Sequence, residues 1–181
     1  RVTNEPPVNP PLPPGDYRKS DSWAEALEEY RKRSYVSKWH VLGPMRPQKA
    51  EFGPERRVDL AEQFKLHDGK QGGWKEHTVD ERAVHRPLNL LFHLQGVQRD
   101  SIAFATTVIQ TDRAHDERLW FDAEYTLDLF VNGWGVARLS DHHTETLVHD
   151  SATALVSFVK GENRIVARVS RRRNALGLAF R

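Results

Sequence analysis

The sequence predicts an all-β protein, an antiparallel jelly-roll β-sandwich of about nine strands with an N-terminal proline-rich arm and one short α-helix. The first observation is Asn132-Gly133, which lies between two segments of alternating hydrophobicity and favours a two-residue type I′ hairpin turn. The second is a series of short alternating segments separated by turn residues from residue 35 onward. The third is length: 181 residues, 38% of them hydrophobic, can bury the core of one domain.

The N-terminal region divides into an arm and a helix. Residues 1–20 contain three Pro-Pro pairs, which favour extended polyproline geometry in an arm or linker. The alternative is a proline-rich ligand motif for another protein. Residues 21–34 are expected to form an amphipathic helix, because Ser22 and Glu25 fit a capping box. An apolar stripe at helical spacing would dock this helix on the sheet or on a partner: Trp23, Ala26, Leu27 and Tyr30.

Residues 35–181 are expected to form the sandwich. A first strand should end at Gly43-Pro44, residues 57–64 are ambiguous with a short helical turn near Asp59, and residues 65–73 are a polar loop. Residues 111–118 read as a solvated loop between strands. The remaining strand candidates are residues 74–79, 88–94, 101–110, 119–121, 125–131, 134–139, 146–149, 154–159, 164–169 and 176–180.

The central hairpin has a predicted register. A two-residue loop pairs Val131 with Trp134 and Leu129 with Val136 on one face, and directs Phe130 to the other. These pairs follow from the position of Asn132-Gly133 alone.

Charge and cysteine content limit the classes of function. Nine acidic and three basic residues lie within residues 111–150, whereas seven basic residues and one acidic residue lie within 151–181. A basic patch is one interpretation, and complementary charge on neighbouring strands is the favoured one. No nucleic-acid partner is expected, because the aromatic and basic motifs of such modules are missing. The chain has no cysteine, and no apolar run reaches the length of a membrane span.

Five segments in this order resemble one bacterial domain family. They are WHVLGP at 39–44, IAFATTVI at 102–109, LDLFVNG at 127–133, KGENRIV at 160–166 and GLAFR at 177–181. Together they resemble the galactose-binding-like β-sandwich of carbohydrate-binding modules and accessory domains in large extracytoplasmic proteins. The resemblance implies a jelly roll over residues 35–181, carbohydrate as ligand, and a periplasmic or secreted location.

Two tryptophans are candidates for sugar binding. Pyranose rings stack on aromatic faces, while amides and carboxylates bind their hydroxyl groups. Trp134 and Trp74 each stand beside glycine at a turn, where an indole could project towards a ligand. The alternative for Trp134 is packing over its cross-strand neighbour Val131.

His142 and His143 are further ligand candidates, with Asp141, Glu145 and His149 nearby. They could bind zinc only from a loop, because adjacent residues of a strand point to opposite faces. A solvated polar loop is the favoured interpretation. No cofactor is predicted beyond a structural Ca²⁺, which the resemblance suggests, with oxygen ligands from Asp122, Glu124 and Asp128.

The sequence therefore indicates a non-catalytic binding or accessory module, with carbohydrate as the expected ligand, within or attached to a larger extracytoplasmic protein or complex. The alternative is a protein–protein interaction domain that docks on another subunit through its arm and helix. Enzyme activity is not expected, because none of the nucleophile, metalloprotease or phosphate-binding motifs occurs.

Overall fold

The computed structural model describes residues 36–47, 53–78, 88–89, 100–123, 126–139, 152–170 and 177–180. The predicted arm (1–20), the predicted helix (21–34) and the strand expected at 146–149 lie outside these residues. The described part contains twelve β-strands and one short 3₁₀ turn, η1 (Gly53–Glu55). The protein is thus mostly β, as predicted. The strand count exceeds the expected nine partly because three of the strands have only two residues.

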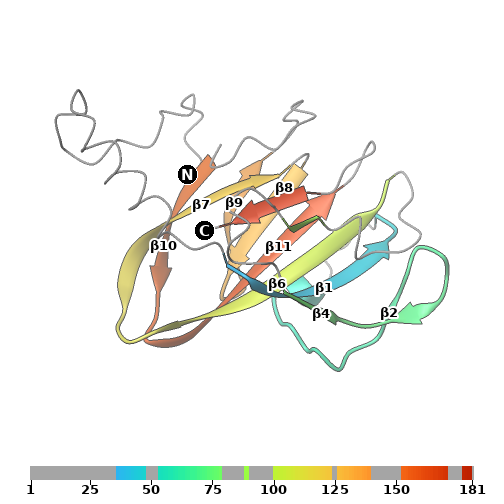
Figure 1. The fold of residues 1–181 in the computed structure, drawn as a ribbon, viewed down its shortest axis with the longest axis horizontal. Coiled ribbons are helices and arrows are strands. Elements are labelled where there is room, and N and C mark those ends of the chain that lie inside the picture. Colours follow the sequence, from blue (N-terminus) through green and yellow to red (C-terminus); the bar gives the residue numbers. More distant parts are fainter. Residues whose placement is uncertain are drawn as a thin grey trace.

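The largest sheet is antiparallel and has six strands (Figure 1). Its order is β4-β1-β6-β11-β8-β9, so β6 and β11 occupy the centre. Strands distant in sequence are neighbours here, which places the C-terminal β11 between β6 and β8. The bounds of the six strands are β1 (Lys38–Met45), β4 (Lys75–Thr78), β6 (Ile102–Thr111), β8 (Thr126–Val131), β9 (Trp134–Leu139) and β11 (Gly161–Ser170).

A second antiparallel sheet has four strands in the order β10-β7-β12-β5. Its strands are β5 (Leu88–Asn89), β7 (His115–Ala123), β10 (Ala152–Phe158) and β12 (Gly177–Phe180). β7 begins earlier than expected, so the prediction of a loop across residues 111–118 is wrong from His115 onward. Those residues continue the ladder with β10 as far as the pair His115–Phe158. The charged residues suggested a solvated loop, but they are compatible with a strand because Asp116 and Arg118 form hydrogen bonds with side chains of β10 at the surface.

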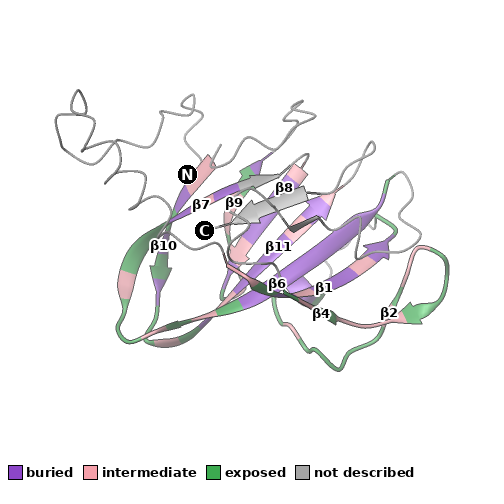
Figure 2. Ribbon diagram, viewed as in Figure 1, coloured by how far each residue is buried: buried purple, intermediate pink, exposed green. Residues whose placement is uncertain are grey.

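The main core lies between these two sheets. Side chains from alternate positions of β1, β6, β8 and β11 meet those of β7 and β10, and Figure 2 shows the central strands as largely buried. Trp39 is 2% exposed, and its indole Nε1 donates to the carbonyl of Val36 at 2.8 Å. The largest fully buried side chains of this core are Trp39, Phe121, Leu127, Leu129, Ile165, Val41 and Val169.

A second apolar cluster covers the opposite, outer face of the six-stranded sheet. Leu42, Phe104 and Val166 are buried there. The chain between β1 and β4 supplies the cover, with Val58, Phe64, Leu66 and Trp74 packed on the sheet. This segment includes η1 and a small hairpin of β2 (Phe64–Lys65) and β3 (Gln71–Gly72), so the prediction of a loop over residues 65–73 is wrong where these two short strands pair. A turn does form at Asp59, whose carbonyl accepts from the amide of Glu62 and whose carboxylate accepts from that of Ala61.

β1 does not end at Gly43-Pro44, contrary to the sequence prediction. The strand continues to Met45, with an irregular register between Leu42 and Met45. Gly43 has a φ of +133°, and a Cβ there would lie 3.1 Å from the carbonyl oxygen of Ile102. Glycine therefore allows the strand to bend against β6 instead of stopping.

The Asn132-Gly133 turn joins β8 and β9 as predicted. Both residues have positive φ, at 51° and 81°, and Val131 pairs with Trp134. Leu129, however, pairs with Ala137 rather than with the predicted Val136, because a bulge lies between Leu129 and Phe130. The bulge allows Leu127 and Leu139 to pair and to enter the core together.

Candidate functional site

Trp134 is the most exposed large apolar side chain described, at 79%. It is the first residue of β9, an edge strand of the six-stranded sheet, and it pairs directly with Val131. Directly paired residues share a face of an antiparallel sheet, and the Val131 side chain enters the core between the sheets. Trp134 therefore leaves the hairpin on the inner side of the six-stranded sheet, beyond the edge of the core.

Trp74 lies on the other side of that sheet. It immediately precedes β4 and packs, half-buried, against the outer cluster of Leu42, Phe104 and Val166. Its indole Nε1 is buried and has no hydrogen-bond partner in the described part of the chain. The two tryptophans proposed from sequence thus stand on opposite faces of the six-stranded sheet and do not form one site.

The remaining predicted site residues are not brought together in the residues described. His142, His143 and Glu124 lie outside them, as does the Asp122 side chain, whose backbone pairs with Ala179 in the four-stranded sheet. No group of three His, Cys, Asp or Glu that could hold a metal occurs among the described residues. The Ca²⁺ hypothesis stays a prediction.

Asp128 has a different environment from the one expected of a calcium ligand. It is 8% exposed on the outer face, and Nη2 and Nε of Arg168 donate to its Oδ2 at 2.7 and 3.1 Å. Nε of Arg138 lies 3.3 Å from Oδ1. Backbone pairing aligns these residues, since Arg168 stands opposite Asp128 and Asp128 opposite Arg138. Complementary charge on neighbouring strands is therefore found at this position.

Glu55 completes this buried ion-pair network. Its carboxylate accepts from Nη1 of Arg168, and its side chain is only 4% exposed. Burial alone would lower the pKa of Arg168, but hydrogen bonds and charges from Asp128 and Glu55 outweigh it and raise that pKa above its ordinary value. Sequence reasoning missed Glu55 because it follows β1 by only ten residues yet contacts β11, far along the chain.

The β8–β9 turn is held by a second polar network centred on Asn163, which is fully buried. Oδ1 of Asn163 accepts from the side-chain amide of Asn132 and from the backbone amide of Val159, both at 2.9 Å. Nδ2 of Asn163 donates to the carbonyls of Val159 and Gly161 at 2.8 and 3.2 Å and to Oγ1 of Thr111 at 3.1 Å. The network joins the end of β6, the β8–β9 turn and the β10–β11 turn. It thereby fixes the base of the hairpin that carries Trp134.

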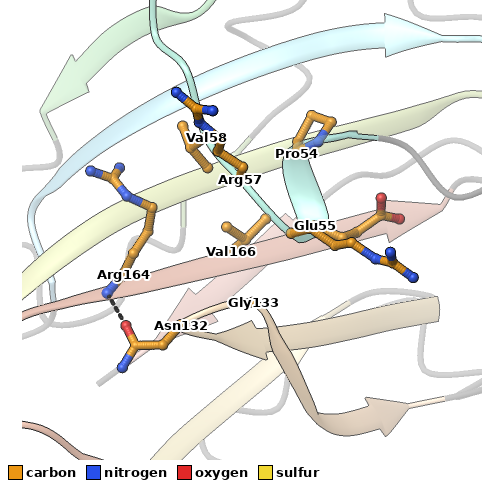
Figure 3. Close-up of a pocket in the computed structure, with 9 residues that line it drawn as sticks. Pro54, Glu55, Arg57, Val58, Asn132, Gly133, Arg164 and Val166 are labelled. Carbon is orange, nitrogen blue, oxygen red and sulfur yellow. Dashed lines mark hydrogen bonds between the residues drawn. The ribbon is translucent and has the colours of Figure 1, made fainter.

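A shallow depression of about 200 Å³ opens on the outer face, between η1 and the β8–β9 turn (Figure 3). The amide of Arg164 donates to Oδ1 of Asn132 across one wall at 2.9 Å. The floor is apolar, whereas three arginines bring positive charge to the lining. The residues that line the depression are Pro54, Glu55, Arg56, Arg57, Val58, Asn132, Gly133, Arg164 and Val166.

Comparison with protein-family models found no match, and comparison with curated proteins found no significant similarity. No helix in the described part of the chain is long and apolar enough to cross a membrane.

Proposed function

We propose that this chain is a non-catalytic binding module, built on a jelly-roll sandwich, that takes carbohydrate on the indole of Trp134. One observation carries the proposal: Trp134 is 79% exposed although it lies in a β-strand. Leaving an indole in water forgoes the free energy that its burial would supply. A large apolar side chain held in solvent on an ordered element is therefore a candidate contact for a ligand.

The support for Trp134 suits a stacking contact. The Asn132–Asn163 hydrogen bond holds the turn against β11, together with two bonds to Arg164: the Asn132 amide donates to the Arg164 carbonyl, and the Arg164 amide donates to Oδ1 of Asn132. An aromatic ring on a fixed backbone loses little conformational entropy on binding, because only two side-chain torsions must be ordered. The apolar face of a pyranose is a suitable partner for such a ring, and the resemblance of five segments to carbohydrate-binding modules favours the same ligand.

A periplasmic or secreted location is part of the same proposal and rests on that resemblance. The competing function is protein–protein interaction. An exposed indole is also enriched at protein interfaces, so the experiment must separate a glycan from a protein partner.

The proposal is tested by affinity electrophoresis and a glycan array with the full chain, comparing wild type with Trp134→Ala and Trp134→Phe. Wild type should bind at least one neutral glycan with millimolar or better affinity. Trp134→Ala should weaken that binding by about tenfold or more, whereas Trp134→Phe keeps a stacking ring and should retain most of it.

Leu155→Ala is the matched control, because Leu155 is also exposed, at 65%, but belongs to β10 of the other sheet. It should bind as wild type does. Binding unaffected by Trp134→Ala would contradict the proposal, as would the absence of any glycan ligand for a folded wild-type chain. Co-purification of a protein partner that depends on residues 1–34, with no glycan bound, would favour the interaction domain instead.

A further inference from the structure

Arg57 and Arg164 line the outer depression, and their guanidinium groups make no ion pair or side-chain hydrogen bond with any described residue. Elsewhere on this face, by contrast, the charges of Arg168 and Arg138 are matched by carboxylates. We propose that the depression binds a tetrahedral oxyanion, namely a phosphate or sulfate group. This site goes beyond the proposed carbohydrate contact and does not depend on it.

The carboxylate that lines the depression does not neutralise these two arginines. Glu55 is bonded to Arg168, and in Figure 3 its carboxylate lies away from the guanidinium groups of Arg57 and Arg164. The depression therefore has a net positive charge. Arginine carries its charge at all accessible pH values and binds phosphate or sulfate oxygens through paired N–H donors.

The walls of the depression are held in a fixed arrangement. A Cβ on Gly133 would lie 3.0 Å from the carbonyl oxygen of Arg56, so the hairpin turn packs directly on the segment after η1. The same turn is tied to β11, because Asn132 and Arg164 exchange two hydrogen bonds. Val58 and Val166 anchor the floor in the outer apolar cluster. The backbones that carry both arginines are therefore positioned before a ligand arrives, which lowers the entropic cost of binding.

The size of the depression limits the ligand. At about 200 Å³ it is smaller than the usual range for drug-sized ligands. It has room for one charged group, and the rest of a larger molecule would extend into solvent. A phosphate or sulfate group at the end of such a molecule satisfies both the charge and the volume.

The experiment titrates the ¹⁵N-labelled full chain with inorganic sulfate and, separately, with inorganic phosphate, at ionic strength held constant with sodium chloride. Amide shifts should saturate for at least one ion and should centre on residues 55–58, 132–133 and 164. Losing two charge-assisted contacts should weaken binding in the Arg57→Gln/Arg164→Gln variant by about tenfold or more. Sulfate binding alone would assign a sulfated ligand, and phosphate binding alone a phosphorylated one.

The matched control is Arg113→Gln/Arg118→Gln, which removes the same charge from β7 and the turn before it. It should bind within about twofold of wild type, since only long-range charge changes. Shifts that stay linear with concentration would overturn the proposal, and so would equal weakening in the two double variants. Trp134→Ala should bind the ion normally, because Trp134 emerges on the other face; the oxyanion site and the carbohydrate contact can therefore fail independently.

Discussion

The side-chain amide of Asn132 donates to Oδ1 of Asn163 at 2.9 Å and so joins the β8–β9 turn to the turn between β10 and β11. Asn132 has the positive φ that the turn requires, and Asn163 is fully buried. One asparagine therefore shapes the turn and the other fixes its position. The other hydrogen bonds of Asn163 go to Val159 and Gly161 in the turn between β10 and β11, and to Thr111 at the end of β6.

Asn163→Ala should destabilise the protein by about 2–4 kcal/mol, because it leaves several buried donors and acceptors without partners at once. Urea unfolding followed by tryptophan fluorescence measures the change. Gln110→Ala is the control, since Gln110 makes one exposed side-chain hydrogen bond to Glu162 on the same strand pair. Similar losses of unfolding free energy in the two variants would show that the buried Asn163 network contributes no more than one exposed hydrogen bond.

Arg168→Met should cost about 2–4 kcal/mol of unfolding free energy at pH 7, because the buried Asp128 and Glu55 carboxylates would lose the guanidinium that bridges them. Urea unfolding at pH 7 measures the change.

Arg138→Gln is the control for this network. The Arg138 side chain is 68% exposed, although it also contacts Asp128, so its loss should cost about 1 kcal/mol or less. A deficit in Arg168→Met no larger than that in Arg138→Gln would contradict a special role for the buried contacts of Arg168.

The sequence carries enough local information to predict most strands, but not how they pair. Asn132-Gly133 predicted its hairpin because the required backbone angles are a property of those two residues. The shift of Leu129 from Val136 to Ala137 depends on a bulge that lets Leu127 and Leu139 enter the core together, and no local pattern specifies it. Likewise, residues 115–118 read as a loop because their partners in β10 lie about forty residues away.

The same limit applies to the candidate sites. The position of Trp134 beside a turn allows an exposed side chain, but the sequence allowed packing over Val131 as well and favoured it slightly. The Glu55–Arg168–Asp128 network and the depression beside it depend on the six-stranded order, in which β11 lies between β6 and β8. In the sequence these charged residues resemble ordinary surface residues, because no fixed sequence spacing relates η1, β8 and β11.

Replacing Trp39 and replacing Trp134 should change the unfolding free energy by different amounts, because one side chain is in the core and the other is exposed. Trp39→Ala should cost about 3–5 kcal/mol, since this side chain is 2% exposed between the sheets and its indole is hydrogen-bonded. Trp134→Ala should change the unfolding free energy by only about 0.5 kcal/mol. Chemical denaturation followed by circular dichroism measures both. A large loss in Trp134→Ala would mean that this indole has a structural role, and would weaken its assignment to a ligand.

Gly133→Ala should loosen the contact between the hairpin turn and the segment after η1. Gly133 has a φ of +81°, and a new Cβ would meet the Arg56 carbonyl oxygen at 3.0 Å. Gly69→Ala is a matched control, because Gly69 has a φ of +86° with nothing within 4 Å of a new Cβ. In both variants alanine must adopt a positive φ, which costs about 1–2 kcal/mol.

The difference between the two glycine variants isolates the contact itself. We expect Gly133→Ala to be less stable than Gly69→Ala by about 1–2 kcal/mol in urea unfolding, because backbone atoms on both sides must move apart. It should also weaken sulfate or phosphate binding, since Asn132 and Gly133 form one wall of the depression, whereas Gly69→Ala should not. Equal stability and unchanged ion binding in the two variants would show that the turn and the η1 segment are not held together by this close approach.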